Sequence, residues 1–200
     1  MNYIKDVALY NNDGTVNGVI EICPNTKDKN ELVEPGFNRL QCVRKITIDY
    51  PFYYGSFPQT YAGDKDPLDM ILFTNKDHKV LDLVKVDVIG AVKTVDCGEQ
   101  DDKIICVESD CSLIKVKKHL KKAIKFLHEY KGKDADMQID KKLASRLEAD
   151  ELVSKSNEEY INMNKKGVKV TAQKSSNTDK KDTSSTAKSS NNRVRVVTRG

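Results

Sequence analysis

The sequence has no long hydrophobic run. It contains no stretch of about 18 consecutive apolar residues, which excludes a transmembrane helix of ordinary length. Its beginning also has no apolar block of signal-peptide length and carries the charged residues Lys5, Asp6 and Asp13. We therefore expect a protein that is neither membrane-embedded nor exported.

Cysteine is scarce, and its spacing excludes two common structural uses. The chain has five cysteines, an odd number, and no two of them form a C-x-x-C motif. We therefore expect neither a disulfide framework nor a structural zinc site, and reduced thiols favour a cytoplasmic location. The five are Cys23, Cys42, Cys97, Cys106 and Cys111.

Charge is unevenly distributed along the chain. The whole sequence carries a formal +4, but residues 164–200 have ten Lys or Arg against two Asp, a local net charge of +8. The preceding residues therefore carry −4. The last segment is also poor in apolar residues, so burial cannot offset the entropy of ordering it. We expect a folded domain at 1–166 and a basic tail at 167–200.

The first 110 residues predict strands, because β-branched stretches alternate there with turn residues. Gly90 interrupts one Val-rich stretch, which predicts a bulge or bend. The lengths and spacing suit a small barrel or a sandwich, and the pattern does not choose between them. The expected strands cover residues 16–22, 40–48, 69–73, 83–95 and 103–107.

The following segment changes to a helical period. Apolar residues at helical spacing, with lysines opposite, predict an amphipathic helix over 113–130 that stops near Gly132. A second, less regular helix is expected over 141–162. Within it, Ser156 and Glu159 have the spacing of a capping box, which predicts a break. Residues 167–192 lack periodicity and predict disorder, whereas 193–198 alternate and predict a strand only if a partner supplies an edge.

Three carboxylates within six residues mark the strongest local signal. Asp64, Asp66 and Asp69 come just before an apolar strand. Repulsion between like charges makes such a cluster costly unless cations occupy it, and hard oxygen ligands favour Mg²⁺, Mn²⁺ or Ca²⁺ over zinc. An acidic, solvated turn is the alternative interpretation.

A second acidic segment, 96–103, lies between two expected strands, and a plain hairpin loop would have the same composition. Glu21 sits inside a strand, where it faces either solvent or the mouth of a barrel. Lysine, arginine and tyrosine residues are interleaved with these acids. Carboxylates that hold metals beside cations that bind phosphate suit phosphoryl transfer to water. Sequence spacing alone does not show that they converge.

Seven short motifs follow one another along the chain. They are V-I-E-I at 19–22, K-x-E at 29–31, V-R at 43–44, Y-P-x-x-Y-G-x-x-P-Q-T at 50–60, D-x-D-P-x-D at 64–69, D-x-G-E-x-D-D-K-I-I at 96–105 and Y-K at 130–131. Taken in order, these segments resemble the soluble family I inorganic pyrophosphatases over about residues 19–131. The resemblance implies an α+β, mainly β fold, a five-stranded OB-like β-barrel flanked by helices, to which the composition adds the disordered C-terminal tail.

The resemblance also implies hydrolysis of pyrophosphate to two orthophosphates, with three to four Mg²⁺ per active site and Mn²⁺ as an alternative ion. Asp66 is the expected proton acceptor for the attacking water, and Tyr54 supports the site by hydrogen bonding. The implied metal ligands are Glu21, Glu31, Asp64, Asp69, Asp96 and Asp101, and the implied substrate-binding residues are Lys29, Arg44, Tyr54, Lys103, Tyr130 and Lys131.

Some positions depart from the family pattern. Cys97 stands where the family usually has glutamate, Asn30 replaces an aromatic residue, and tryptophan is absent. One residue is missing between Glu21 and Lys29, which makes Lys27 an alternative to Lys29. These departures bear on metal affinity and local packing.

Two other functions compete with pyrophosphate hydrolysis. One is an OB-like module that binds nucleic acid or another polyanion through its basic tail, since a charge of +8 supplies salt-dependent affinity. The other is a pyrophosphatase-like protein without activity. The resemblance further favours a homo-oligomer, with a hexamer preferred over a dimer.

Overall fold

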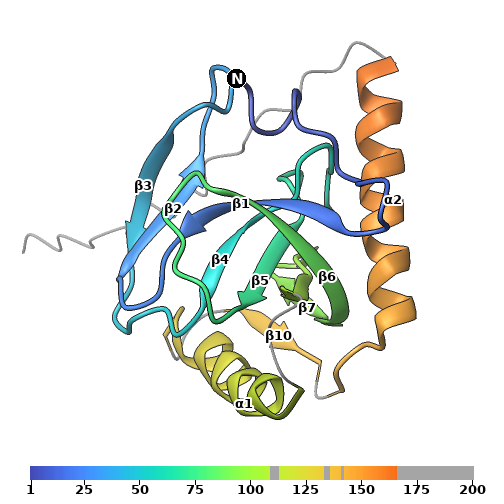
Figure 1. Cartoon of the computed structure of the whole chain (residues 1–200). Coiled ribbons are helices and arrows are strands. Elements are labelled where there is room, and N and C mark those ends of the chain that lie inside the picture. Colours follow the sequence, from blue (N-terminus) through green and yellow to red (C-terminus); the bar gives the residue numbers. More distant parts are fainter. Residues whose placement is uncertain (109–112, 133–135, 141, 166–200) are drawn as a thin grey trace, which may run out of the picture.

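The computed structural model describes residues 1–108, 113–132, 136–140 and 142–165 (Figure 1). The predicted tail at 167–200, with its conditional strand at 193–198, lies outside the described residues. The strands are β1 (Val16–Ile22), β2 (Asp28–Leu32), β3 (Leu40–Lys45), β4 (Tyr53–Ser56), β5 (Asp69–Phe73), β6 (Leu83–Val92), β7 (Thr94–Asp96), β8 (Glu99–Gln100), β9 (Lys103–Val107) and β10 (Met137–Ile139), and the helices are α1 (Leu113–Glu129) and α2 (Arg146–Lys165).

Five strands close into a barrel in the order β1-β4-β5-β9-β6. Neighbours in this barrel are antiparallel except β5 and β9, which run parallel. The closed five-stranded barrel confirms the predicted OB-like architecture. The register shifts between Val88 and Gly90, which confirms the expected irregularity in β6.

Two smaller sheets extend the barrel. β2 and β3 form an antiparallel ribbon, seen at the left of Figure 1, and β10, β7 and β8 form a three-stranded sheet. Lys29 pairs with Arg44 across the ribbon, so its two basic side chains come from neighbouring strands. The ribbon carries the candidate site residues Lys29, Glu31 and Arg44, and the three-stranded sheet carries Asp96.

Alternation of side chains explains how the barrel strands bury their inner face. In β6, Val84, Val86 and Val88 are buried, whereas Lys85 between them is exposed. Full burial of a side chain of this size contributes about 1.5–3 kcal/mol. The resulting apolar interior gives the polar residues at the strand ends a rigid base.

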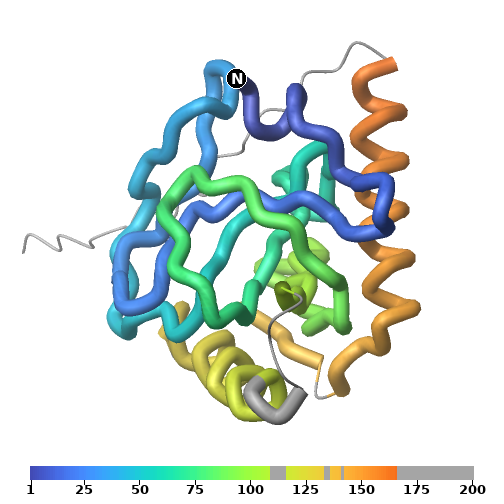
Figure 2. Tube along the Cα trace, viewed as in Figure 1, coloured from blue at the N-terminus to red at the C-terminus, as the bar shows by residue number. Residues whose placement is uncertain are grey.

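The two helices cover different sides of the barrel (Figure 2). α1 packs Ala123, Phe126 and Leu127 into a cluster with Tyr50 and Phe52 of the barrel side. α2 buries Ala149 and Val153 against the other core cluster, which includes residues of β6. Within the part of the chain that the structure describes, no helix is long and apolar enough to cross a membrane.

The predicted break inside the second helix is wrong. Ser156 is a buried residue within a continuous α2, and its carbonyl oxygen accepts a hydrogen bond from the Tyr61 amide at 2.9 Å. The capping box lies instead at the true start of the helix. There the Ser145 amide and hydroxyl each donate to Glu148 at 2.8 Å, and these bonds lower the pKa of Glu148 to about 2.

Close backbone contacts explain two glycines. A Cβ added at Gly55 would lie 1.8 Å from the Val19 carbonyl oxygen, so β4 pairs with β1 only because that position has no side chain. A Cβ at Gly90 would lie 2.8 Å from the carbonyl oxygen of Ala144, where the segment before α2 crosses β6.

Candidate active site

Polar residues gather at the end of the barrel where β5 and β9 begin. Asp69 and Lys103 are the first pair of this parallel ladder. The Lys103 side chain is 2% exposed, and its ammonium group forms ion pairs with Asp69, at 2.5 Å, and with Asp101. The Tyr54 hydroxyl also donates to Asp69. A buried cation and a phenol therefore fix the orientation of one carboxylate.

The pKa of Asp69 is lowered, whereas those of the neighbouring Asp64 and Asp101 are raised. Burial opposes ionisation of Asp69, but Lys103 and Lys29 outweigh it and lower its pKa. Burial likewise opposes the charged form of Lys103, yet Asp69 and Asp101 raise its pKa well above the usual value. The pair is thus a salt bridge to a buried lysine, whose charge is stable there only because carboxylates compensate it.

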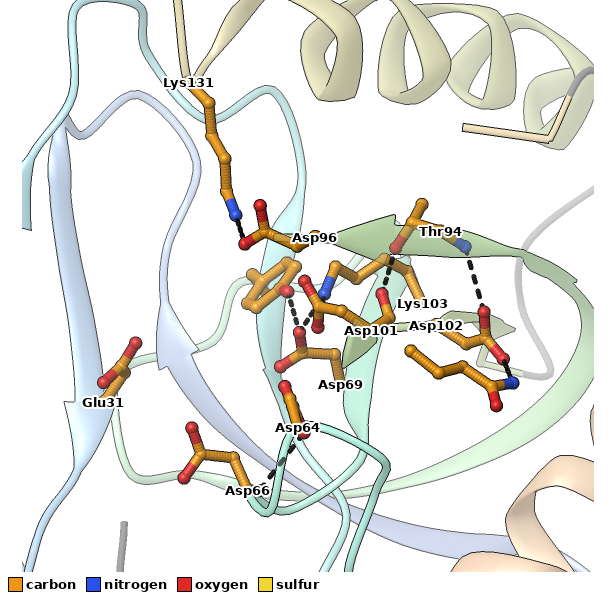
Figure 3. Close-up of polar contacts among 12 residues, drawn as sticks. Glu31, Asp64, Asp66, Asp69, Thr94, Asp96, Asp101, Asp102, Lys103 and Lys131 are labelled. Carbon is orange, nitrogen blue, oxygen red and sulfur yellow. Dashed lines mark hydrogen bonds and ion pairs between the residues drawn. The ribbon is translucent and has the colours of Figure 1, made fainter. Parts of the chain in front are cut away.

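Asp64 and Asp101 are carboxyl groups whose ionised form is disfavoured by their surroundings. Burial, reinforced by repulsion from Asp69 and Asp101, raises the pKa of Asp64 to about 8. Burial also raises the pKa of Asp101, despite its contact with Lys103. Figure 3 shows Asp64, Asp69 and Asp101 close together around the first residues of β5 and β9. The site therefore holds more carboxylates than its nearest cation can neutralise.

Asp66 extends from the same turn as Asp64. Its amide donates to the Asp64 carboxylate at 3.2 Å, and its own side chain is half-buried. In Figure 3 its carboxylate lies between those of Glu31 and Asp64. The turn is tight, with Lys65 at a φ of 71°, which spaces the two acids along the rim of the site.

Glu21 lies at the barrel mouth rather than on a solvent face. It is 5% exposed, and its carboxylate accepts hydrogen bonds from the Ser56 hydroxyl at 2.8 Å and the Leu32 amide at 3.4 Å. Burial, together with the charges of Asp69 and Glu31, raises its pKa to about 8. Sequence reasoning missed Ser56, although its position two residues after Tyr54 in β4 places both side chains on one face.

Cationic and phenolic groups form a second wall of the site, and two of its lysines pair with acids. Lys29 pairs with Glu31 at 2.5 Å, and the charges of Glu31 and Asp69 raise its pKa although burial opposes this. Lys27 is exposed, so Lys29 is the lysine of this strand that faces the site. Arg44 lies over the Tyr130 ring, with its guanidinium carbon 5.8 Å from the ring centroid.

Lys131 reaches into the site from just beyond the end of α1. It forms an ion pair with Asp96 of β7, which Figure 3 shows as a dashed line between the two side chains. Burial, with repulsion from Lys29 and Arg44, lowers the pKa of Lys131 to about 8. Positive charge is thus crowded on this wall as negative charge is crowded on the other.

All thirteen residues predicted from the sequence therefore border one region. A further residue, Asp102, supports it from behind: its carboxylate accepts from the Thr94 amide at 2.9 Å and from Gln100 at 2.6 Å. Thr94 in turn donates from its hydroxyl to the Asp101 carbonyl. Sequence reasoning did not separate Asp102 from the other acids of its loop, because only these hydrogen bonds mark it as structural.

The residues at the acidic wall fit a hard divalent cation in kind. Asp64, Asp69 and Asp101 offer carboxylate oxygens, the preferred ligands of Mg²⁺, and the raised pKa of Asp64 shows that burial and neighbouring carboxylates disfavour its ionised form in the absence of an added cation. As the side chains lie, no three carboxylate, histidine or cysteine groups within the described ranges form a closed ligand set. Lys103 takes up part of the ligand capacity of Asp69 and Asp101.

Clustered carboxylates facing lysine, arginine and tyrosine at the mouth of an OB-like barrel define a class. This arrangement is typical of proteins that transfer phosphoryl groups with the help of divalent metals. A model of the inorganic pyrophosphatase family matches residues 18–161. The chain therefore belongs to the inorganic pyrophosphatase family, as the motif resemblance predicted.

Individual relatives agree with this assignment. The chain is 34% identical over 91 residues to an inorganic pyrophosphatase of Picrophilus torridus, covering 44% of this chain and 51% of the relative. It is 34% identical over 95 residues to a soluble inorganic pyrophosphatase of Zea mays, covering 47% and 44%. The chain thus spans about half the length of the curated relatives it matches.

Solved structures share the fold more completely. The type I inorganic pyrophosphatase from P falciparum superposes with a TM-score of 0.74 at 25% identity, covering 82% of this chain and 64% of that chain. An inorganic pyrophosphatase from Neisseria gonorrhoeae gives 0.68 at 26% identity, covering 78% and 97%. These matches do not favour the competing interpretation of the chain as a nucleic-acid-binding module, nor that of an inactive homologue.

Proposed function

We propose that this chain hydrolyses inorganic pyrophosphate to two orthophosphates with the help of Mg²⁺. The observation that carries the proposal is the arrangement of two walls: uncompensated carboxylates around Asp64, and crowded cations around Lys131. Pyrophosphate is a compact anion that needs cations to bind and metal ions to react. Membership in the inorganic pyrophosphatase family gives this chemistry its substrate.

The cationic wall would bind the phosphates. Lys29, Arg44 and Lys131 repel one another when no anion lies between them, as the lowered pKa of Lys131 indicates. A bound phosphate group relieves that repulsion and keeps Lys131 protonated. Tyr130 and Tyr54 supply hydroxyl donors, and burial raises the pKa of both, so they remain protonated near neutral pH.

The acidic wall would hold the metal ions. Asp64, Asp69 and Asp101 are the proposed central ligands, with Glu21, Glu31 and Asp96 around them. Bound Mg²⁺ lowers the pKa of coordinated water and neutralises charge on the phosphates. The proposed number is three to four ions, with Mn²⁺ as a substitute.

Asp66 is the proposed proton acceptor. Its carboxylate lies between those of Glu31 and Asp64, and from there it would accept the proton of the attacking water. The water oxygen bonds to one phosphorus while the bridging P–O bond breaks, and the electron pair leaves with the second phosphate. Lys29, Arg44 and Lys131 offset the charge that develops on this leaving group.

Measuring orthophosphate release from pyrophosphate by purified protein, with Mg²⁺ and with excess chelator, tests the proposal directly. We expect release with Mg²⁺ only. The Asp66→Asn variant should keep the fold and lose about 10²–10⁴-fold in turnover, the usual contribution of a general base. Asp6→Asn, a change of the same kind at an exposed position, is the matched control and should stay fully active. Full activity of Asp66→Asn, or none in the unmodified protein, contradicts the proposal.

Localisation, domain organisation and assembly are proposed as well. We propose a cytoplasmic protein organised as a pyrophosphatase domain at 1–166 with a basic tail at 167–200 that contacts polyanions. We also propose homo-oligomerisation, with a hexamer ahead of a dimer. Sizing chromatography with light scattering measures the oligomeric state.

A further inference from the structure

The exposed face of α1 is a basic surface that the active site does not use. Lys117, Lys118, Lys121, Lys122 and Lys125 are all exposed, and we call them the α1 lysine face. The buried face of the helix, with Ala123, Phe126 and Leu127, packs on the barrel. No described element lies on the far side of α1 in Figures 1 and 2. The lysine face therefore points to solvent, away from the site.

The positive charge of α1 contrasts with the net negative charge of the surrounding chain. α1 has six lysines and one glutamate, a net +5, whereas the other residues up to 163 have 18 basic and 27 acidic side chains, a net −9. Among the described residues, Lys125 is the one member of the face with an acidic partner, Glu129, at 4.0 Å. This surface is therefore a strong local exception in an acidic domain.

The spacing of these lysines is unfavourable for the helix itself. Lys117 and Lys121, Lys118 and Lys122, and Lys121 and Lys125 are each four residues apart, so like charges lie side by side on consecutive turns. Such pairs destabilise a helix unless an anion shields them. Packing of the apolar face explains why α1 forms, but it does not explain why the outer face carries one sign of charge.

The lysines form two rows on a convex surface. One row contains Lys117, Lys121 and Lys125, and the other Lys118 and Lys122, because residues four apart stack along a helix. An α-helix with its side chains is about 10–12 Å across. The major groove of B-DNA is about 12 Å wide and has a row of phosphates on each side. A groove engages both rows at once, whereas a flat membrane surface meets mainly the middle of a convex helix.

We propose that the α1 lysine face binds the phosphate backbone of double-stranded DNA without sequence preference. Charge complementarity supplies the attraction, through release of counterions from the phosphates. The face has no exposed phenylalanine, tyrosine, tryptophan or arginine side chain to stack on unpaired bases, which favours a duplex over a single strand. The apolar face of α1 is buried, so the helix has nothing to insert into a lipid bilayer. This proposal does not depend on pyrophosphate hydrolysis.

Fluorescence anisotropy with a labelled 20-base-pair duplex tests the proposal on the full chain. Removing two cations in Lys121→Gln/Lys122→Gln should weaken binding about tenfold at low salt and reduce the slope of log affinity against log salt by about 1.8. The matched control, Lys5→Gln/Lys155→Gln, removes the same charge from exposed positions elsewhere and should leave both quantities nearly unchanged. Pyrophosphate hydrolysis should be equal in all three proteins, because none of these lysines lies in the site.

Three outcomes would overturn the proposal. One is the absence of duplex binding at low salt. A second is equal weakening by both double variants, or no weakening by the α1 variant, which would assign binding to diffuse charge or to the basic tail. The third is tighter binding to single-stranded DNA of the same sequence or to phosphatidylserine vesicles. Circular dichroism of the α1 variant checks that the helix is retained, and loss of like-charge repulsion should make it no less stable.

Discussion

The two ends of the parallel β5–β9 pair carry buried polar groups with opposite charge balance. At the start, Asp69 and Lys103 stand beside Asp64 and Asp101, and acids outnumber bases. Just beyond the other end, Glu108 accepts hydrogen bonds from Thr74 and, at 3.0 Å, from Lys76, and it contacts the His78 ring at 2.8 Å. The same two strands thus position both clusters.

The difference shows in the pKa values. Burial alone would raise the pKa of Glu108, but hydrogen bonds from Thr74, His78 and Lys76 outweigh it and lower the pKa. At the other end, burial raises the pKa values of Asp64 and Asp101, because Lys103 cannot balance all the acids. A cluster in which hydrogen bonds and cations compensate the carboxylate stabilises the fold. A cluster with more carboxyl groups than cations favours the binding of an added cation. Charge balance therefore distinguishes the cluster around Glu108, which we expect to be structural, from the proposed site around Asp69.

The largest expected effect comes from Asp69→Asn. This variant keeps the shape of the side chain but removes the carboxylate that contacts both Tyr54 and Lys103. We expect at least a 10²-fold loss of pyrophosphate turnover, because a proposed metal ligand and the charge partner of a buried lysine are lost together. Steady-state phosphate release measures this, and a loss below fivefold would show that Asp69 is not central.

Addition of Mg²⁺ should stabilise the protein through the acidic end. A ligand at about 100 times its dissociation constant stabilises the native state by about 2.7 kcal/mol. We expect Mg²⁺ to raise the Tm of the unmodified chain, and chelation to reverse the rise. Asp101→Asn should lose most of this shift, while Glu108→Gln at the far end should retain it. Differential scanning fluorimetry distinguishes the two variants, and equal shifts in both would contradict the proposed ligands.

At the far end, Glu108→Gln should affect stability and leave catalysis intact. The side chain is 8% exposed, and its charge-assisted bonds to Lys76 and His78 are lost or weakened. Hydrogen bonds to charged groups contribute about 1.5–3 kcal/mol each, so we expect a loss of roughly 1–3 kcal/mol in the free energy of unfolding. Urea denaturation measures the loss, and turnover below the unfolding range should be unchanged.

Acid should remove the difference in stability between the unmodified chain and the Glu108→Gln variant. The folded-state pKa of Glu108 is lowered from its ordinary value of 4.5, so its stabilising effect is fully present above about pH 4.5. It disappears as pH falls through the folded-state pKa, where Glu108 becomes protonated and resembles glutamine. The gap in free energy of unfolding between the unmodified chain and Glu108→Gln should therefore be constant from pH 6 to 8 and shrink below pH 4.5. A gap that grows with acid would contradict this assignment.

Strands with strong β-branched patterns were predictable from the sequence. The expected strands at 16–22, 69–73 and 103–107 have the bounds of β1, β5 and β9. β2 and β4 were missed for physical reasons. The segment that forms β2 is polar and does not alternate, so it depends on pairing with β3, and β4 depends on the close approach of Gly55 to Val19. Pairing partners of this kind are not visible in a linear pattern.

The residues of the site were predictable from the sequence, but the way in which their charges compensate one another was not. Motif order identified Asp64, Asp69 and Lys103, and the structure brings them together. The sequence did not show that Lys103 lies between two carboxylates, or that Ser56 holds Glu21 at the barrel mouth. Those facts depend on register across the barrel, because paired residues come from strands far apart in the chain. The roles of the individual residues stay predictions until the variants are measured.

The α1 lysine face also constrains symmetry. In a contact around a two-fold axis, each subunit presents the same patch to its partner. Five lysines facing five others would repel at neutral pH, so α1 cannot lie on such an axis unless anions fill the gap. Any two-fold interface of the assembled protein should therefore use another surface. In the proposed homo-oligomer the helix would remain outward-facing in every subunit, and assembly would multiply the number of basic faces instead of hiding them.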